Sequence, residues 1–331
     1  MAAVVDAAAA VAGASEVKTR TAAMIGNFLA RRKQSSFILC AALVLWLGPA
    51  AAQESFKSPE EAVTALVDAA KTQSKSDVLT VLGPKGRQVI SSGDAVADRA
   101  ARDKFVAAYD AKHSLTEDGD KTTLVIGDND WPFPIPLVQT DGKWRFDTAA
   151  GLDEILRRRI GRNELSAIQV CLAYVQAQNE YASLDPAGLG PHAYAQRLVS
   201  SPGNKDGLYW PTAEGEEPSP LGDLAAQASA EGYKVGQAPI PYHGYFYRVL
   251  KRQGKSAAGG AYDYVVNGKM IGGFALLAYP AEYGNSGIMS FLVNHEGEVF
   301  EKDLGPRTDK LARKIEIFAP DQTWNKADTQ P

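Results

Sequence analysis

The amino-acid sequence predicts an α+β protein of two domains, in which helices and antiparallel strands occupy separate stretches of the chain. Capped amphipathic segments fill residues 58–111, whereas short runs rich in β-branched and aromatic residues fill residues 121–147 and 242–303. Residues 152–184 between them keep a helical apolar period. About 280 residues follow residue 52, which is room for two domains of ordinary size.

An apolar run near the N-terminus predicts export. Three basic residues, 31–33, precede the apolar residues 37–47, and small residues follow up to Ala52. A basic region, a short apolar core and alanines at the cleavage site are the three parts of a secretory signal peptide. We therefore expect residues 1–52 to be a signal peptide that is cut between Ala52 and Gln53.

Met24 is an alternative start, because beginning there gives the basic region its ordinary length. The apolar run is shorter than the roughly 20 residues that a membrane helix needs, so we expect no transmembrane anchor after cleavage. An uncleaved signal anchor is the alternative. The expected location is the bacterial periplasm or the exterior.

Charge and cysteine content exclude some classes of function. The whole sequence has 35 Lys and Arg against 39 Asp and Glu, a formal net charge of −4, and the leader carries an excess of basic residues. A mildly acidic mature chain lacks the basic surface that nucleic-acid binding requires, so no nucleic acid is expected as a partner. Cys171 is the only cysteine after the leader and is interpreted as a small core residue.

The first domain, residues 53–150, opens with a clearly marked helix. Ser58 supplies an N-cap and Pro59 the first helical position. Two short helical pieces and a helix beginning at Asp94 follow, and strands begin at Lys121. Helices over a curled antiparallel sheet, in this order, resemble the cone-shaped fold of nuclear transport factor 2, which implies an enclosed pocket. Its polar candidates, which form no catalytic pair by spacing, are Asp128, Asp130, Arg145 and Asp147.

A long connecting helix is expected over residues 151–184, interrupted or pinched near Gly161. The arginines at 157–159 are interpreted as a solvated face, with contact to an acidic partner or a phosphate as the alternative. Residues 185–331 form the second domain, with long loops and then antiparallel strands. A long helix packed on such a sheet resembles the heads of pilin and pseudopilin proteins. The segments that carry this resemblance are residues 163–168, 177–181 and 290–297.

Over nearly its whole mature length the chain is similar to an uncharacterised bacterial exported family, a domain of unknown function with the number 2950. This resemblance implies no activity, because none is established for the family. Relatives can carry an acidic, calcium-loop-like stretch after the long helix, whereas residues 185–190 hold a single carboxylate. Calcium needs several charged oxygens, so no calcium is expected here. The segments that carry the similarity are residues 126–132, 206–211, 262–268 and 278–284.

Common catalytic signatures fail in this sequence. Residues 254–256 lack the leading glycine of a phosphate loop, and residues 284–288 lack the final glycine of a nucleophile elbow. Val299 stands where a zinc-binding helix that starts at His295 would need its second histidine. We expect no cofactor and no metal, and we favour a non-enzymatic role.

Aromatic residues with polar neighbours form the predicted binding surface of the second domain. Tyrosine rings give a large contact area with a polar end, which suits binding surfaces. The alternative interpretation is that these rings cover the sheet and satisfy their hydroxyl groups locally. The candidate residues are Tyr209, Trp210, Tyr242, His243, Tyr245, Tyr247, Tyr262 and Tyr283.

The sequence therefore favours an exported cell-envelope protein that binds a partner protein or acts as a scaffold. One alternative is a periplasmic hydrolase whose groups, Asp263, His243 and Glu282, meet only in three dimensions. Another is small-molecule binding in the cone of the first domain. A catalyst needs titratable groups within hydrogen-bond reach in a cleft, and a scaffold needs an exposed aromatic patch. The sequence leaves the partner and the oligomeric state open.

Overall fold

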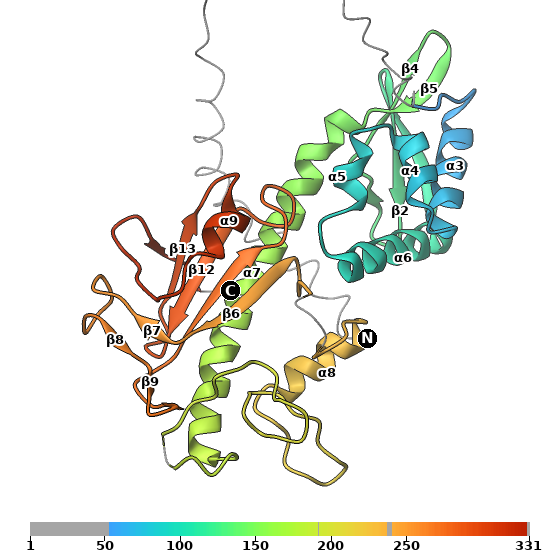
Figure 1. The fold of residues 1–331 in the computed structure, drawn as a ribbon. Coiled ribbons are helices and arrows are strands. Elements are labelled where there is room, and N and C mark those ends of the chain that lie inside the picture. The colour runs from blue at the N-terminus through green and yellow to red at the C-terminus, as the bar shows by residue number, and fades with distance from the viewer. Residues whose placement is uncertain (1–52, 191, 237–239, 330–331) are drawn as a thin grey trace, which may run out of the picture. The chain divides into compact units, whose positions relative to one another are not determined.

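The computed structural model describes residues 53–190, 192–236 and 240–329 (Figure 1). Its class is α+β with antiparallel sheets, as the sequence predicts. The predicted signal peptide, residues 1–52, lies outside the described residues. In the described ranges, no helix combines the length and the apolar character that crossing a membrane requires.

Four helices open the described chain, and the first and the fourth begin where their caps predict. The Ser58 side chain accepts a hydrogen bond from the Glu61 amide, and Pro59 occupies the first turn. The Asp94 carboxylate accepts two amides of the first turn of the fourth helix. These helices are α3 (Pro59–Lys71), α4 (Lys75–Leu82), α5 (Gly86–Ile90) and α6 (Ala95–Ala111).

The first sheet follows directly and includes one strand that the sequence pattern missed. In β1, five of six side chains are exposed and only Leu115 is partly buried, so no alternation of apolar residues announced it. The strand order is β1-β2-β4-β5, with β3 paired to β2. Helices and sheet enclose the N-terminal core, which includes Leu66, Leu124 and Phe146. The strands are β1 (His113–Asp118), β2 (Lys121–Ile126), β3 (Trp131–Pro132), β4 (Leu137–Thr140) and β5 (Lys143–Phe146).

The long helix α7 (Thr148–Leu184) is continuous over 37 residues. The pinch expected near Gly161 is wrong, because the helix passes through this glycine and a Cβ there would meet nothing within 4 Å. Close packing instead requires Gly151, where a Cβ would lie 2.4 Å from the Pro134 carbonyl oxygen. Ile155 of α7 packs against the N-terminal core, whereas Tyr174 is buried in the second core.

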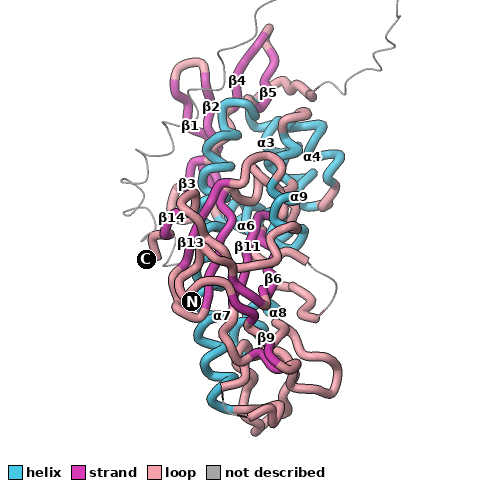
Figure 2. Tube along the Cα trace, turned by 60° about the vertical axis from the view of Figure 1, so that its left-hand side comes forward, coloured by secondary structure: helices cyan, strands magenta, loops and turns pink. Residues whose placement is uncertain are grey.

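The second sheet has the strand order β14-β13-β12-β11-β6, so β6 is an outer strand. The helix α7 contacts β11, β12 and β13, and Figure 1 shows it running along these strands. Figure 2 shows the same strands, in magenta, from a second direction. The main strands are β6 (Tyr245–Leu250), β11 (Ala275–Pro280), β12 (Met289–Asn294), β13 (Val299–Asp303) and β14 (Asn325–Lys326). The C-terminal core between helix and sheet includes Ile168, Tyr174, Tyr245, Leu277 and Phe291.

Short elements complete this part of the chain. Residues 262–266 form two strands with different partners. The change occurs at the buried Tyr264, whose amide donates to the Lys251 carbonyl and whose carbonyl accepts the Ile271 amide. Asn267 and Gly268, a dipeptide that favours hairpin turns, join β9 to β10. Two helices, α8 (Gly222–Ala230) and α9 (Thr308–Ala312), were not predicted. The short strands are β7 (Arg252–Gln253), β8 (Tyr262–Asp263), β9 (Val265–Val266) and β10 (Lys269–Met270).

Arg159 joins α7 to helix α5 and to the loop before β12, two segments that are distant in sequence. Its guanidinium donates to the Gln88 carbonyl at 2.7 Å, to the Val89 carbonyl, and to Asn285 Oδ1 at 2.6 Å. The amide of Asn285 in turn donates to the Ser91 carbonyl at 2.7 Å. Burial lowers the pKa of Arg159, which is the expected cost of placing a charge in this junction. Only Arg157 and Arg158 of the arginine run are exposed.

Replacing Arg159 by Ala is expected to lower the free energy of unfolding by about 3 kcal/mol, because three oxygen acceptors lose their donor in a partly buried site. Urea unfolding followed by circular dichroism measures this loss. Arg157→Ala is the control, because Arg157 is exposed and pairs with Glu154 of its own helix. Equal effects of the two variants would contradict the role given to Arg159.

A second contact of α7 depends on pH. The Glu164 carboxylate accepts the amides of Ile288 and Met289 at 2.9 and 3.0 Å. Burial raises the pKa of Glu164 and outweighs the lowering effect of these two hydrogen bonds. The folded state therefore binds this proton more tightly than the unfolded state, so the contribution of Glu164 to stability is greatest at low pH.

Glu164→Gln is expected to reduce the loss of stability that accompanies rising pH, beginning near the ordinary glutamate pKa of 4.5. The glutamine oxygen still accepts both amides, while the charge that resists burial is gone. Urea unfolding at a series of pH values up to neutrality measures the difference. Glu217→Gln, at an exposed loop position, serves as the control. An unchanged pH slope in Glu164→Gln would refute this account.

Candidate functional site

A two-residue turn leads into the outer strand β6. Tyr242 and Tyr245 exchange backbone hydrogen bonds of 2.9 and 3.1 Å, and the central residues His243 and Gly244 have φ angles of 49° and 77°. Positive φ at both central positions is typical of a type I′ turn, which favours Asn and Gly. A histidine in this conformation is uncommon and persists only where its surroundings hold it. The turn therefore presents the imidazole of His243 from a fixed backbone.

The carboxylate of Asp94 holds this turn in place. Asp94 is 1% exposed, and its Oδ2 accepts hydrogen bonds of 2.9 Å from the Gly244 amide and the Tyr233 hydroxyl. Its Oδ1 caps α6, as described above. Gly244 has no room for a side chain, since a Cβ would lie 2.5 Å from Asn163 Nδ2. One buried carboxylate thus connects α6, the loop after α8 and the turn before β6.

His243 is oriented by a second carboxylate and by aromatic rings. Its Nε2 lies 2.6 Å from Glu231 Oε2, and the two side chains are 28% and 34% exposed. The ring of Tyr242 stacks on the imidazole with centroids 4.1 Å apart, and Tyr233 meets Tyr242 edge-on at 5.0 Å. We call Asp94, Glu231, Tyr233, Tyr242 and His243 the Tyr–His cluster. It presents a partly exposed, oriented imidazole.

The tyrosines of this region remain neutral at physiological pH. Burial, assisted by the Glu231 carboxylate, raises the pKa of Tyr242 to about 12. Burial and the nearby Asp94 raise the pKa of Tyr233 further, and burial likewise raises the pKa of Tyr247. The hydroxyl of Tyr247 is buried and has no hydrogen-bond partner among the described residues. These phenols therefore act as hydrogen-bonding and packing groups.

The structure separates the eight predicted binding residues. Tyr245 is fully buried and donates to the Met289 carbonyl, and Trp210 is 7% exposed. Both were expected at a surface, and this expectation is corrected because their rings fill the C-terminal core. Only Tyr242 and His243 stack on each other within the set.

The other predicted residues have different neighbours. Tyr209 hydrogen-bonds through its backbone to Leu198 and Ser200. Tyr262 is 38% exposed and meets Tyr264 edge-on. Tyr283 donates to Asp303 at 3.2 Å. These residues belong to local networks of the second half of the chain.

The three residues of the hydrolase alternative also lie in different networks. His243 pairs with Glu231, whereas the carboxylate of Glu282 accepts a hydrogen bond from Asn285 at 2.9 Å. Asp263 is exposed on β8. No hydrogen bond or ion pair joins any two of the three in the described structure. The geometry therefore gives this combination no shared site.

Cation ligands do not gather in the described ranges: no group of three or more His, Cys, Asp or Glu side chains there has the geometry to hold a metal ion. In the loop after α7, the Asp185 carboxylate accepts the amides of Leu189 and Gly190 at 2.8 and 3.1 Å. Both oxygens of Asp185 therefore accept hydrogen bonds within the loop that this residue begins. In the N-terminal part, Asp130 forms an ion pair with Lys112, and Asp147 caps α7.

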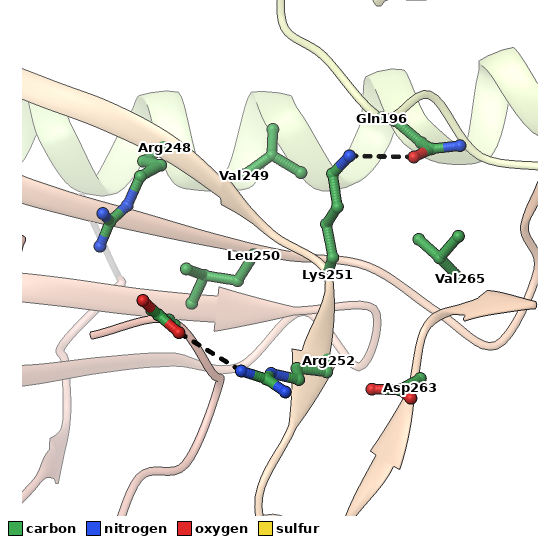
Figure 3. Close-up of a pocket in the computed structure, with 9 residues that line it drawn as sticks. Gln196, Arg248, Val249, Leu250, Lys251, Arg252, Asp263 and Val265 are labelled. Carbon is green, nitrogen blue, oxygen red and sulfur yellow. Dashed lines mark hydrogen bonds and ion pairs between the residues drawn. The ribbon is translucent and has the colours of Figure 1, made fainter. Parts of the chain in front are cut away.

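A groove of about 430 Å³ lies along the end of β6 (Figure 3). Its apolar floor includes Val249, Leu250 and Val265. Lys251 donates to Gln196 Oε1 at 3.0 Å, and Arg252 pairs with Glu316 at 3.3 Å. The remaining polar side chains of the rim are Arg248 and Asp263.

Sequence reasoning missed three members of the Tyr–His cluster. Asp94 was identified only as a helix cap, and Glu231 and Tyr233 were not singled out. Asp94 lies 139 residues from Tyr233 and 150 from Gly244 along the chain. The local signal was Gly244, because glycine readily adopts the positive φ that such a turn requires. No spacing rule joins residues so far apart.

Tyr233→Phe is expected to lower the free energy of unfolding by about 1–3 kcal/mol, because the buried Asp94 carboxylate loses one of its donors. Urea unfolding gives the value. Tyr262→Phe removes a hydroxyl from a ring that is 38% exposed, and we expect little change from it. A Tyr233→Phe protein as stable as the Tyr262→Phe protein would show that the Asp94 contact contributes nothing.

Comparisons with known proteins give a family but no activity. Residues 53–327 match the sequence model of the family described as "Protein of unknown function (DUF2950)". No curated protein and no solved structure matches the chain, so the likenesses to nuclear transport factor 2 and to pilin heads stay predictions. The match begins at the first residue after the predicted cleavage site and covers most of the chain. The chain therefore belongs to the DUF2950 family.

Proposed function

We propose that this chain is an exported, non-catalytic binding component of the bacterial cell envelope, and that the Tyr–His cluster contacts its protein partner. The observation that carries this proposal is the stacked pair of Tyr242 and His243 on a turn that buried Asp94 holds in place. Aromatic side chains whose position is fixed before binding lose little conformational freedom on association, which favours affinity. Partial exposure leaves the imidazole accessible.

Two features of the N-terminal region support export. The family match begins at residue 53, where the predicted mature chain begins. The side-chain amide of Gln53 donates to the carbonyls of Val81 and Phe146 at 3.0 and 2.8 Å. In a chain cut before Gln53, these contacts would attach the first residue to the N-terminal core.

The chemistry of the candidate site supports binding over catalysis. The hydrogen bonds described for His243 involve Glu231 and Tyr233, and the Tyr233 hydroxyl is committed to Asp94. Cys171, the thiol of the mature chain, is fully buried, and burial raises its pKa to about 12. A thiol in this state is a poor nucleophile. The groups arranged around His243 therefore suit recognition.

The test is an affinity pull-down of the tagged protein from its own host after chemical cross-linking, with mass spectrometry of the envelope fraction. We expect a stoichiometric envelope partner and a mature N-terminus at Gln53. His243→Asn should reduce capture, because Asn tolerates the left-handed turn but lacks the imidazole. Tyr262→Ala, which removes an exposed ring elsewhere, is the control. Full capture by His243→Asn, or the absence of any partner, would overturn the proposal.

A further inference from the structure

The outer edge of β6 offers backbone groups that no described residue uses. The Ala281 amide donates to the Gly244 carbonyl, which fixes the alternation along the strand. By this alternation, Phe246 and Arg248 direct their backbone groups toward β11, whereas Tyr247 and Val249 direct theirs outward. In the described part of the chain, the N–H and C=O groups of Tyr247 and Val249 have no hydrogen-bond partner.

The unpaired stretch is bounded at both ends. On one side, Tyr245 pairs with Tyr242 in the turn of the Tyr–His cluster. On the other side, the Tyr264 amide donates to the Lys251 carbonyl at 2.9 Å. Beyond Tyr264 the chain leaves β6, because β9 pairs with β10 instead. Strand β6 and the segment after Tyr264 therefore separate from this point, and an extended segment can enter between them.

The groove described above lies between these two separating segments. Figure 3 shows Asp263 and Val265 on the segment that faces β6 and β7 across the opening. Val249 and Val265 provide apolar surface beside the unpaired backbone groups of the edge. An incoming strand would therefore find both the hydrogen-bonding groups and the side-chain contacts that strand addition uses.

Charge on the rim of the groove favours an acidic occupant. Lys251 donates a hydrogen bond to the neutral oxygen of Gln196, and Arg248 donates to the carbonyls of Ala312, Arg313 and Ile315 at and after the end of α9. Among the described residues these two cations have no carboxylate partner, and Arg252 already has Glu316. With Asp263 and Glu316 counted, the rim keeps one net positive charge in a chain whose overall charge is negative.

We infer that the free edge of β6 binds an extended acidic segment of a partner protein as an added β-strand, an inference that rests on the proposed binding function. Main-chain hydrogen bonds to Tyr247 and Val249 would supply affinity, and Arg248 and Lys251 would select carboxylates. A second copy of this chain fits less well, because a symmetric pairing sets the same positive rim against itself.

The probe is a fluorescent octapeptide of alternating Glu and Val, titrated into the full mature chain and followed by anisotropy. Val249→Pro removes an outward N–H and leaves the β11 ladder intact, because an outer strand tolerates proline at such a position. We expect it to weaken binding at least about tenfold. Val249→Thr, which keeps the N–H, is the matched control and should bind like the wild type. Lys251→Glu should also weaken binding.

A change to the probe tests the same contacts without altering the protein. An octapeptide N-methylated at alternate residues cannot form the ladder, and one with Lys in place of Glu has the wrong charge, so neither should bind. The inference is overturned if Val249→Pro or the methylated peptide binds as well as its control, or if the acidic probe fails to bind the wild type.

Two further results decide what occupies the edge. Dimerisation of the wild type that Val249→Pro abolishes would assign the edge to a second copy and overturn the inference. In the cross-linked pull-down, a partner lost by His243→Asn but retained by Val249→Pro would overturn the inference while leaving the proposed function standing. Loss of the partner in both variants supports both.

Discussion

The buried carboxylate of Asp94 is the contact on which the candidate site depends. A carboxylate removed from water is costly unless donors replace its hydration. Here the donors are two amides of α6, the Tyr233 hydroxyl and the Gly244 amide. They come from three separate parts of the chain, so satisfying one charge brings these parts together. The left-handed His243 sits beside this contact and is held by it.

Residues 88–94 connect this contact to the second polar junction. Arg159 binds the carbonyls of Gln88 and Val89, and Asn285 binds the Ser91 carbonyl. The end of α5 and the loop that follows it therefore contact α7, the loop before β12 and the turn before β6. Because α7 also contributes to both cores, α7 and residues 88–94 together support the Tyr–His cluster.

Strand β6 carries both surfaces to which we assign binding. It begins at the turn that presents His243 and continues to the groove at Arg248 and Lys251. Outer strands with unpaired backbone groups risk unwanted association, and proteins usually shorten or charge them. Here the unpaired stretch of β6 is short and lies between two local pairings. The cations Arg248 and Lys251 lie at its end. These features limit promiscuous pairing and still admit one extended segment of suitable charge.

Local features were readable from the sequence because they depend on neighbours along the chain. Ser58 with Pro59 predicted the start of α3, and Asp94 predicted the start of α6. The sequence did not predict the exposed strand β1 or the continuity of α7 through Gly161, because tertiary packing overrides weak local preferences. Burial of Tyr245, the position of Arg159, and the meeting of Asp94 with Tyr233 were decided only by the tertiary structure. Each depends on contacts between residues far apart in sequence, which no local pattern encodes.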